Sequence, residues 1–103
     1  STSIWVMNID GSEQVQVTDA KKGFAFHPRF SPDGKRIVFQ SSKKDKKDAD
    51  LYVVDTDGNN LVQLTVNKSY DGQPYWTTDG YIYFVSDRGN DPGNYQIWRF
   101  KDE

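Results

Sequence analysis

IWVMNIDG (residues 4–11) returns 47 residues later as LYVVDTDG (residues 51–58) and a third time, shortened, as IWRF (residues 97–100). Between these copies, PRFSPDG (residues 28–34) matches PYWTTDG (residues 74–80) at a spacing of 46 residues. A fixed period of this length, built from short apolar runs and Asp-Gly pairs, indicates repeated β-sheet units. Because one such sheet cannot bury both of its faces alone, each unit must pack against its neighbours.

The period and the strand pattern predict an all-β fold made of β-propeller blades, each with four antiparallel strands. We expect nine strands, at residues 4–9, 14–18, 28–30, 36–41, 51–54, 61–65, 74–76, 81–86 and 96–100. The 103 residues then form one propeller segment of about two blades. Its parts are the outer two strands of one blade (1–18), a complete blade (28–65) and three strands of a further blade (74–103).

Several strands are near-continuous apolar or aromatic runs, which is the pattern of strands covered on both faces. Aromatic residues also recur at fixed positions of the repeat, and recurrence favours a packing role over a ligand platform. We therefore expect a core between blades, to which each fully buried ring contributes about 2–3 kcal/mol. The recurring sets are Trp5, Tyr52 and Trp98; Phe30 and Trp76; and Phe39 and Phe84.

The turns divide the expected ring into two rims. Asp-Gly pairs at residues 10–11, 33–34, 57–58 and 79–80 suit tight hairpins, because glycine adopts a positive φ at little steric cost. In an up-and-down blade these four turns share one rim, and the longer connections share the opposite rim. Long loops are where propellers present binding surfaces, so we place function on that second rim, at residues 19–27, 42–50, 66–73 and 87–95.

The composition excludes several classes of partner. A net charge of −2, with both signs mixed along the chain, argues against nucleic acid, and no apolar stretch is long enough for membrane insertion. Without cysteine there are no disulfides and no thiol chemistry. A hydrophobic content of 35% with 15% aromatics indicates a chain that relies on a few large apolar anchors.

FSPDGKRIVF (residues 30–39), LYVVDTDGN (51–59), QLT (63–65) and SDRGN (86–90) together resemble the repeats of TolB-type, WD40-like β-propellers. The resemblance implies a six-bladed ring, periplasmic or extracellular, that acts as a non-catalytic protein-binding scaffold. Related propellers cover the active sites of prolyl-oligopeptidase-type peptidases, so a gating or substrate-recognition segment of a larger hydrolase is the alternative. Six blades at this period need about 280 residues. We therefore expect a complete ring only in a longer parent chain or a homo-oligomer.

The binding residues that we predict lie on the long-loop rim and at the mouth of the central channel. They are His27, Arg29, Lys44, Lys47, Tyr70, Gln73, Tyr75, Arg88 and Asn90. A protein partner is the expected ligand; a sugar or small molecule near His27, Arg29, Gln73 and Tyr75 stays open. We predict no catalytic residues, because the chain has one histidine and no Gly-x-Ser-x-Gly elbow.

DTDGNN (residues 55–60) resembles the start of a calcium loop, but its glycine is fourth instead of sixth and the twelfth position is Val66. The matching Asp-Gly pair at residues 10–11 favours turn chemistry without a metal. We therefore predict no metal and no cofactor. Weak calcium binding on a loop, for example at Asp87, Asp91 and Asn94, is the alternative that stays open.

Overall fold

The computed structural model describes residues 2–19, 23–42, 49–65, 70–89 and 95–101, apart from the side chain of Phe100. The described residues contain nine strands and no helix, and hence no helix that could span a membrane. The strands are β1 (Trp5–Val6), β2 (Val15–Gln16), β3 (Phe24–Phe30), β4 (Arg36–Ser42), β5 (Asp50–Asp55), β6 (Val62–Gln63), β7 (Asp71–Trp76), β8 (Tyr81–Ser86) and β9 (Gln96–Lys101).

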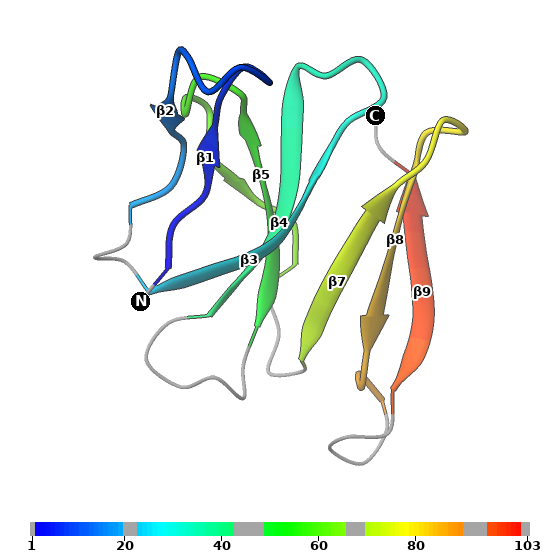
Figure 1. Ribbon diagram of the computed structural model, residues 1–103. Coiled ribbons are helices and arrows are strands. Elements are labelled where there is room, and N and C mark those ends of the chain that lie inside the picture. Colours follow the sequence, from blue (N-terminus) through cyan, green and yellow to red (C-terminus); the bar gives the residue numbers. More distant parts are fainter. Residues whose placement is uncertain (1, 20–22, 43–48, 66–69, 90–94, 102–103) are drawn as a thin grey trace.

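These strands form three antiparallel sheets in which neighbours in sequence are neighbours in space. The first sheet contains β1 and β2, the second β3 to β6, and the third β7 to β9. The sheets stand side by side, with the four Asp-Gly turns at the upper end of the view (Figure 1). The predicted all-β architecture of antiparallel four-stranded units is confirmed.

The second sheet is buried on both faces because its two central strands are apolar at successive positions. Ile37, Phe39 and Val54 face the first sheet and pack with Ile4 and Val17. The alternate residues of the same strands face the third sheet instead. There, Val38 and Val53 pack against Trp76 and Ile82, with Leu64 at the margin. Side chains alternate between the faces of a strand, so an unbroken apolar run requires a neighbour on each side.

The innermost strands are longer than the sequence predicted. Strand β3 begins at Phe24 instead of Pro28, and β7 begins at Asp71 instead of Pro74. Both strands contain a bulge directly before the proline, where the pairing register shifts. At the bulges His27 has φ 54° and Gln73 has φ 50°. A bulge leaves one residue without a ladder partner, so the proline that follows fits where its missing N–H is not needed.

Not all of the recurring aromatic residues belong to the core. Phe39, Trp76 and Phe84 are buried as predicted, with 3%, 6% and 3% of their surfaces exposed. Trp5 and Phe30, however, are 55% and 54% exposed, so the prediction that they are buried is wrong for the described chain. Trp98 is likewise 40% exposed and Tyr52 is only half-buried. Trp5 lies on the first sheet and Trp98 on the third. Phe30 lies on β3, which the two-stranded first sheet covers only in part.

The four Asp-Gly turns share one hydrogen-bond pattern. In each turn the aspartate Oδ1 accepts a hydrogen bond from the backbone N–H two residues later, at 2.9–3.1 Å. The glycine that follows the aspartate has φ between 72° and 90°. Asp33 also accepts a bond from the Ser31 hydroxyl at 2.6 Å. These contacts are the Asx-turn chemistry that favours aspartate before glycine in a hairpin.

The second and third sheets are joined by a buried amide at Gln40. Its Oε1 accepts the backbone N–H of Gln73 at 3.0 Å, and its Nε2 donates to the Tyr70 hydroxyl at 2.6 Å. A Cβ placed on Gly72 would lie 2.6 Å from Gln40 Oε1 and 2.8 Å from a Tyr70 ring carbon. Glycine at residue 72 is therefore what lets the two sheets approach closely.

Gly72→Ala should destabilise the fold by about 1–3 kcal/mol, because the new methyl group overlaps the buried Gln40 amide. Gln40→Ala should also destabilise, but the double variant should lose less than the sum of the two, since the overlap disappears with the amide. Urea denaturation of the two single variants and the double variant measures this coupling. Strict additivity would show that Gln40 does not set the spacing of the sheets.

The Asp-Gly turns should also make the stability of the fold depend on pH. Hydrogen bonds from the hydroxyls of Ser12, Ser31 and Thr77, followed by backbone N–H groups, lower the pKa values of Asp10, Asp33 and Asp79 below their usual 3.8. The folded chain therefore releases these protons more readily than the unfolded chain, so their stabilisation is present above about pH 4 and is lost below it. Thermal unfolding between pH 6 and pH 2 should show this loss. A triple Asp→Asn variant, which keeps the acceptor oxygen, should show a shallower decrease.

Candidate functional site

Four of the predicted binding residues lie together on the two innermost strands. His27 and Arg29 are on β3, Gln73 and Tyr75 are on β7, and all four are exposed. The guanidinium carbon of Arg29 lies 5.6 Å from the centre of the Tyr75 ring, which joins the two strands across the gap between sheets. We call these four residues the inner-strand surface. His27 and Gln73, the two bulge residues with positive φ, occupy equivalent positions of the repeat, and both are exposed.

Among the described residues, no side chain is placed to act with His27 in nucleophilic catalysis. Its ring lies 6.3 Å from the ring of Phe26, tilted by 49°. Within the described ranges, no hydrogen bond joins it to a serine or a carboxylate. The side chain is exposed on a bulge, which suits a contact residue more than a general base, because a base needs a positioned partner.

The remaining predicted residues divide into two groups. Tyr70 is half-buried, and its hydroxyl accepts a hydrogen bond from the Gln40 side-chain amide of the second sheet. Its ring also contacts that of Tyr95 edge-on, with 5.5 Å between ring centres. Tyr70 therefore helps to join the second sheet to the third. Arg88 is also turned inward, as described next. Lys44, Lys47 and Asn90 lie outside the described residues, and their roles stay predictions.

A buried charge pair anchors the third sheet. The carboxylate of Asp71 is fully buried; its Oδ1 accepts the Ser86 hydroxyl at 2.6 Å and its Oδ2 accepts Nη2 of Arg88 at 3.0 Å. Nε of Arg88 donates to Ser86 Oγ at 3.1 Å. The same guanidinium carbon lies 5.0 Å from the Phe84 ring and 5.5 Å from the Trp98 ring. Sequence reasoning identified Arg88 but missed Asp71, because Ala25 occupies the matching position of the previous repeat.

The acidic turn at residues 55–60 is accounted for by hydrogen bonds within the turn. Asp57 Oδ1 accepts the N–H of Asn59, and Asp55 Oδ2 accepts the side-chain amide of Asn60 at 2.7 Å. Among the described residues, no three acidic or histidine side chains are grouped so as to hold a metal. Asp87 Oδ1 accepts the N–H of Tyr70 at 2.8 Å. Asp91 and Asn94, the other members of the suggested calcium site, lie outside the described residues.

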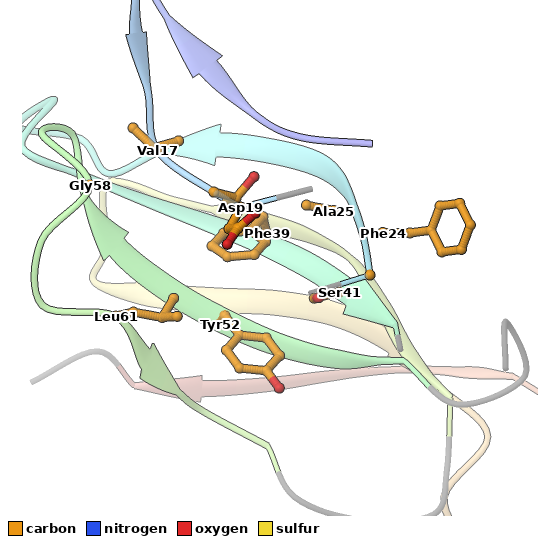
Figure 2. A pocket seen from close by; sticks show the side chains of 11 residues that line it. Val17, Asp19, Phe24, Ala25, Phe39, Ser41, Tyr52, Gly58 and Leu61 are labelled. Atoms are coloured by element: carbon orange, nitrogen blue, oxygen red, sulfur yellow. The ribbon is translucent and has the colours of Figure 1, made fainter. Parts of the chain in front are cut away.

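A pocket that the sequence did not predict lies between the first and second sheets. It has a volume of about 390 Å³, within the range typical of small-ligand sites. Phe39 and Tyr52 form one wall, with ring centres 5.8 Å apart and planes 17° apart. Figure 2 shows Asp19 over this face of the sheet, while the ring of Phe24 points away. Burial, and then the nearby charge of Asp50, raise the pKa of Tyr52 above its usual value.

Comparison with known proteins places this arrangement in the β-propellers. The family profile for the TolB beta propeller domain matches residues 1–102, and the chain belongs to that family. Tol-Pal system protein TolB of Francisella tularensis subsp. mediasiatica (strain FSC147) is 29% identical over 95 residues, which are 92% of this chain and 22% of that protein. The protein of the same name from subsp. tularensis (strain FSC 198) matches equally, over 21% of its length.

A solved structure assigned to TolB of Agrobacterium tumefaciens has the same fold. It superposes with a TM-score of 0.79 at 24% identity, over 96% of this chain and 37% of that one. The chain therefore spans about a fifth of the length of the curated relatives it matches. The predicted family and propeller fold are confirmed.

Arg88→Ala should destabilise the fold by about 3 kcal/mol, because it removes a cation that lies 3.0 Å from the buried Asp71 carboxylate. Arg88→Met should restore part of the packing against Phe84 and Trp98 but not the charge pair. Its free energy of unfolding should therefore lie between those of Arg88→Ala and the unsubstituted protein. Chemical denaturation of both variants gives the values. Equal stability of Arg88→Met and the unsubstituted protein would show that the charge pair adds no net stability.

Proposed function

We propose that the chain is a non-catalytic protein-interaction module of a TolB-type propeller. The observation that carries this proposal is the inner-strand surface, where an exposed arginine lies over an exposed tyrosine ring of the neighbouring repeat and two exposed polar residues, His27 and Gln73, lie on the same two strands. Arginine and tyrosine are enriched where proteins bind each other tightly, because they combine apolar area with directed hydrogen bonds. Tyr75 is 56% exposed, so its ring is available to a partner.

The named relatives favour this function over the gating of a peptidase. Both Francisella proteins are named as proteins of the Tol-Pal system, and the chain is 29% identical to each of them over 95 residues. A component of such a system is the first partner to test. A periplasmic or extracellular location, implied by the family, belongs to the same proposal. The peptidase alternative would require a hydrolase domain joined to these repeats.

Open apolar surface at the outer sheets fits the expectation of further blades or a second copy. Ile97 on β9 is 77% exposed, and Met7 beside β1 is 59% exposed. That a longer parent chain or a homo-oligomer covers this apolar surface stays a prediction.

A photo-crosslinking amino acid at Tyr75 should capture a Tol-Pal component from the cells in which the protein acts, because the inner-strand surface is the proposed contact. The matched control is Lys35, which is also exposed but lies in the hairpin between β3 and β4, outside the inner-strand surface. Arg29→Ala should reduce the yield at Tyr75 several-fold, as expected for a residue at the centre of an interface. Equal capture from Tyr75 and Lys35, or capture unaffected by Arg29→Ala, would contradict the proposal.

A further inference from the structure

The two spaces between the three sheets are built from equivalent positions of the repeat. Strand pairing makes the equivalence exact in register: Ala25 pairs with Ser41 as Asp71 pairs with Ser86. On the next pair of strands, Phe39 faces Tyr52 as Phe84 faces Trp98. The spacings are 45 or 46 residues throughout. Each space is therefore lined by two aromatic residues, one serine and one residue from the start of the innermost strand.

In the space between the second and third sheets, these positions enclose the guanidinium of Arg88. The ring centres of Phe84 and Trp98 lie 5.0 and 5.5 Å from its central carbon. The Ser86 hydroxyl accepts a hydrogen bond from its Nε, and the Asp71 carboxylate accepts one from its Nη2. A planar cation lies over two aromatic rings and is hydrogen-bonded at its edge, a geometry that guanidinium groups favour. The protein thus contains a complete guanidinium site of its own.

In the space between the first and second sheets, the same positions line the 390 Å³ pocket. Phe39, Tyr52 and Ser41 supply the two rings and the hydroxyl. Alanine replaces the buried aspartate, so a methyl group stands where the other site has a carboxylate. The pocket gains an acidic group from a different place, because Asp19, which follows β2, also lines it. Asp50 adds further negative charge near Tyr52.

We infer that this pocket binds a guanidinium group, namely an arginine side chain of the protein partner. The pocket keeps the aromatic wall and the hydroxyl of the Arg88 site, has room for a ligand and carries an acidic residue at its lining. This inference rests on the proposed function only in its choice of a protein as the source of the arginine. The chemistry of the pocket stands apart from the inner-strand surface.

The chain also offers an internal competitor, which the test must separate. Lys43 occupies the position of Arg88 in the previous repeat, 45 residues earlier, and lies outside the described residues. An ammonium group is a compact, strongly hydrated charge that does not stack as a flat guanidinium does. The pocket should therefore prefer arginine to lysine whether or not Lys43 is present.

The test titrates the protein with N-acetylarginine methylamide and follows the resonances of Phe39 and Tyr52 by NMR. The matched probes are N-acetyllysine methylamide, which keeps the charge, and N-acetylnorleucine methylamide, which keeps only the apolar stem. We expect saturable shifts with the arginine probe and at least fivefold weaker binding of the other two. Equal affinities for all three probes, or binding only in Lys43→Ala, would overturn the inference.

Substitutions then locate the site. Tyr52→Leu and Asp19→Asn should each weaken the arginine probe several-fold, and Ala25→Asp, which copies the Asp71 site, should tighten it about tenfold. In Arg88→Ala, the same probe or ethylguanidinium should bind between the second and third sheets and raise the melting temperature, which calibrates the method. If Ala25→Asp weakens binding while folding is retained, the proposed equivalence of the two sites is wrong.

These outcomes are separable from failure of the proposed function. Loss of probe binding with crosslinking at Tyr75 intact would remove the arginine site and leave the inner-strand surface standing. Probe binding that survives while Tyr75 captures no partner would leave the arginine site standing and contradict the inner-strand surface as the contact.

Discussion

The structure depends on the burial of β4 and β5 on both faces. Val38, Leu51 and Val54 have no exposed surface, and Ile37 has 2%. Such strands cannot exist in a single sheet in water, because either face alone would leave a row of aliphatic side chains exposed. Sheets must therefore stack on each side, and the stacking brings the innermost strands β3 and β7 next to each other. The inner-strand surface is a consequence of that apolar constraint.

Apolar positions recur from repeat to repeat, whereas two of the polar positions between sheets, Gln40 and Asp71, do not. Gln40 joins the second sheet to the third, but Val85 occupies the same position one repeat later. Asp71 holds a cation where Ala25 leaves a pocket. A hydrophobic contact tolerates any neighbour of similar size, while a buried amide or carboxylate must find its own hydrogen-bond partners. Each junction between sheets is thus distinct, although the sheets share one architecture.

The sequence was sufficient to predict the fold because its signals are local and repeated. Asp-Gly turns, apolar runs and a 46–47-residue period each depend on neighbours along the chain, and all three were found as expected. The start of β3 and β7 was not predicted, since a proline before a short run resembles a strand boundary and the bulge at His27 depends on pairing with β4. The pairing of Arg88 with a buried carboxylate was missed for a similar reason: its partner Asp71 lies 17 residues away and has no counterpart in the earlier repeat.

The candidate sites follow from the same distinction between recurring and non-recurring residues. Phe39 and Phe84 recur because packing requires them, and their rings form the walls of both spaces between sheets. Beside those walls the two repeats differ, because Asp71 and Arg88 of one correspond to Ala25 and Lys43 of the other. Changing a single residue at the start of an innermost strand, from aspartate to alanine, removes the acceptor for an internal cation without disturbing the ring pair. In a stacked-sheet fold, a binding pocket therefore arises most readily where one repeat lacks the polar side chain that its neighbour uses for stability.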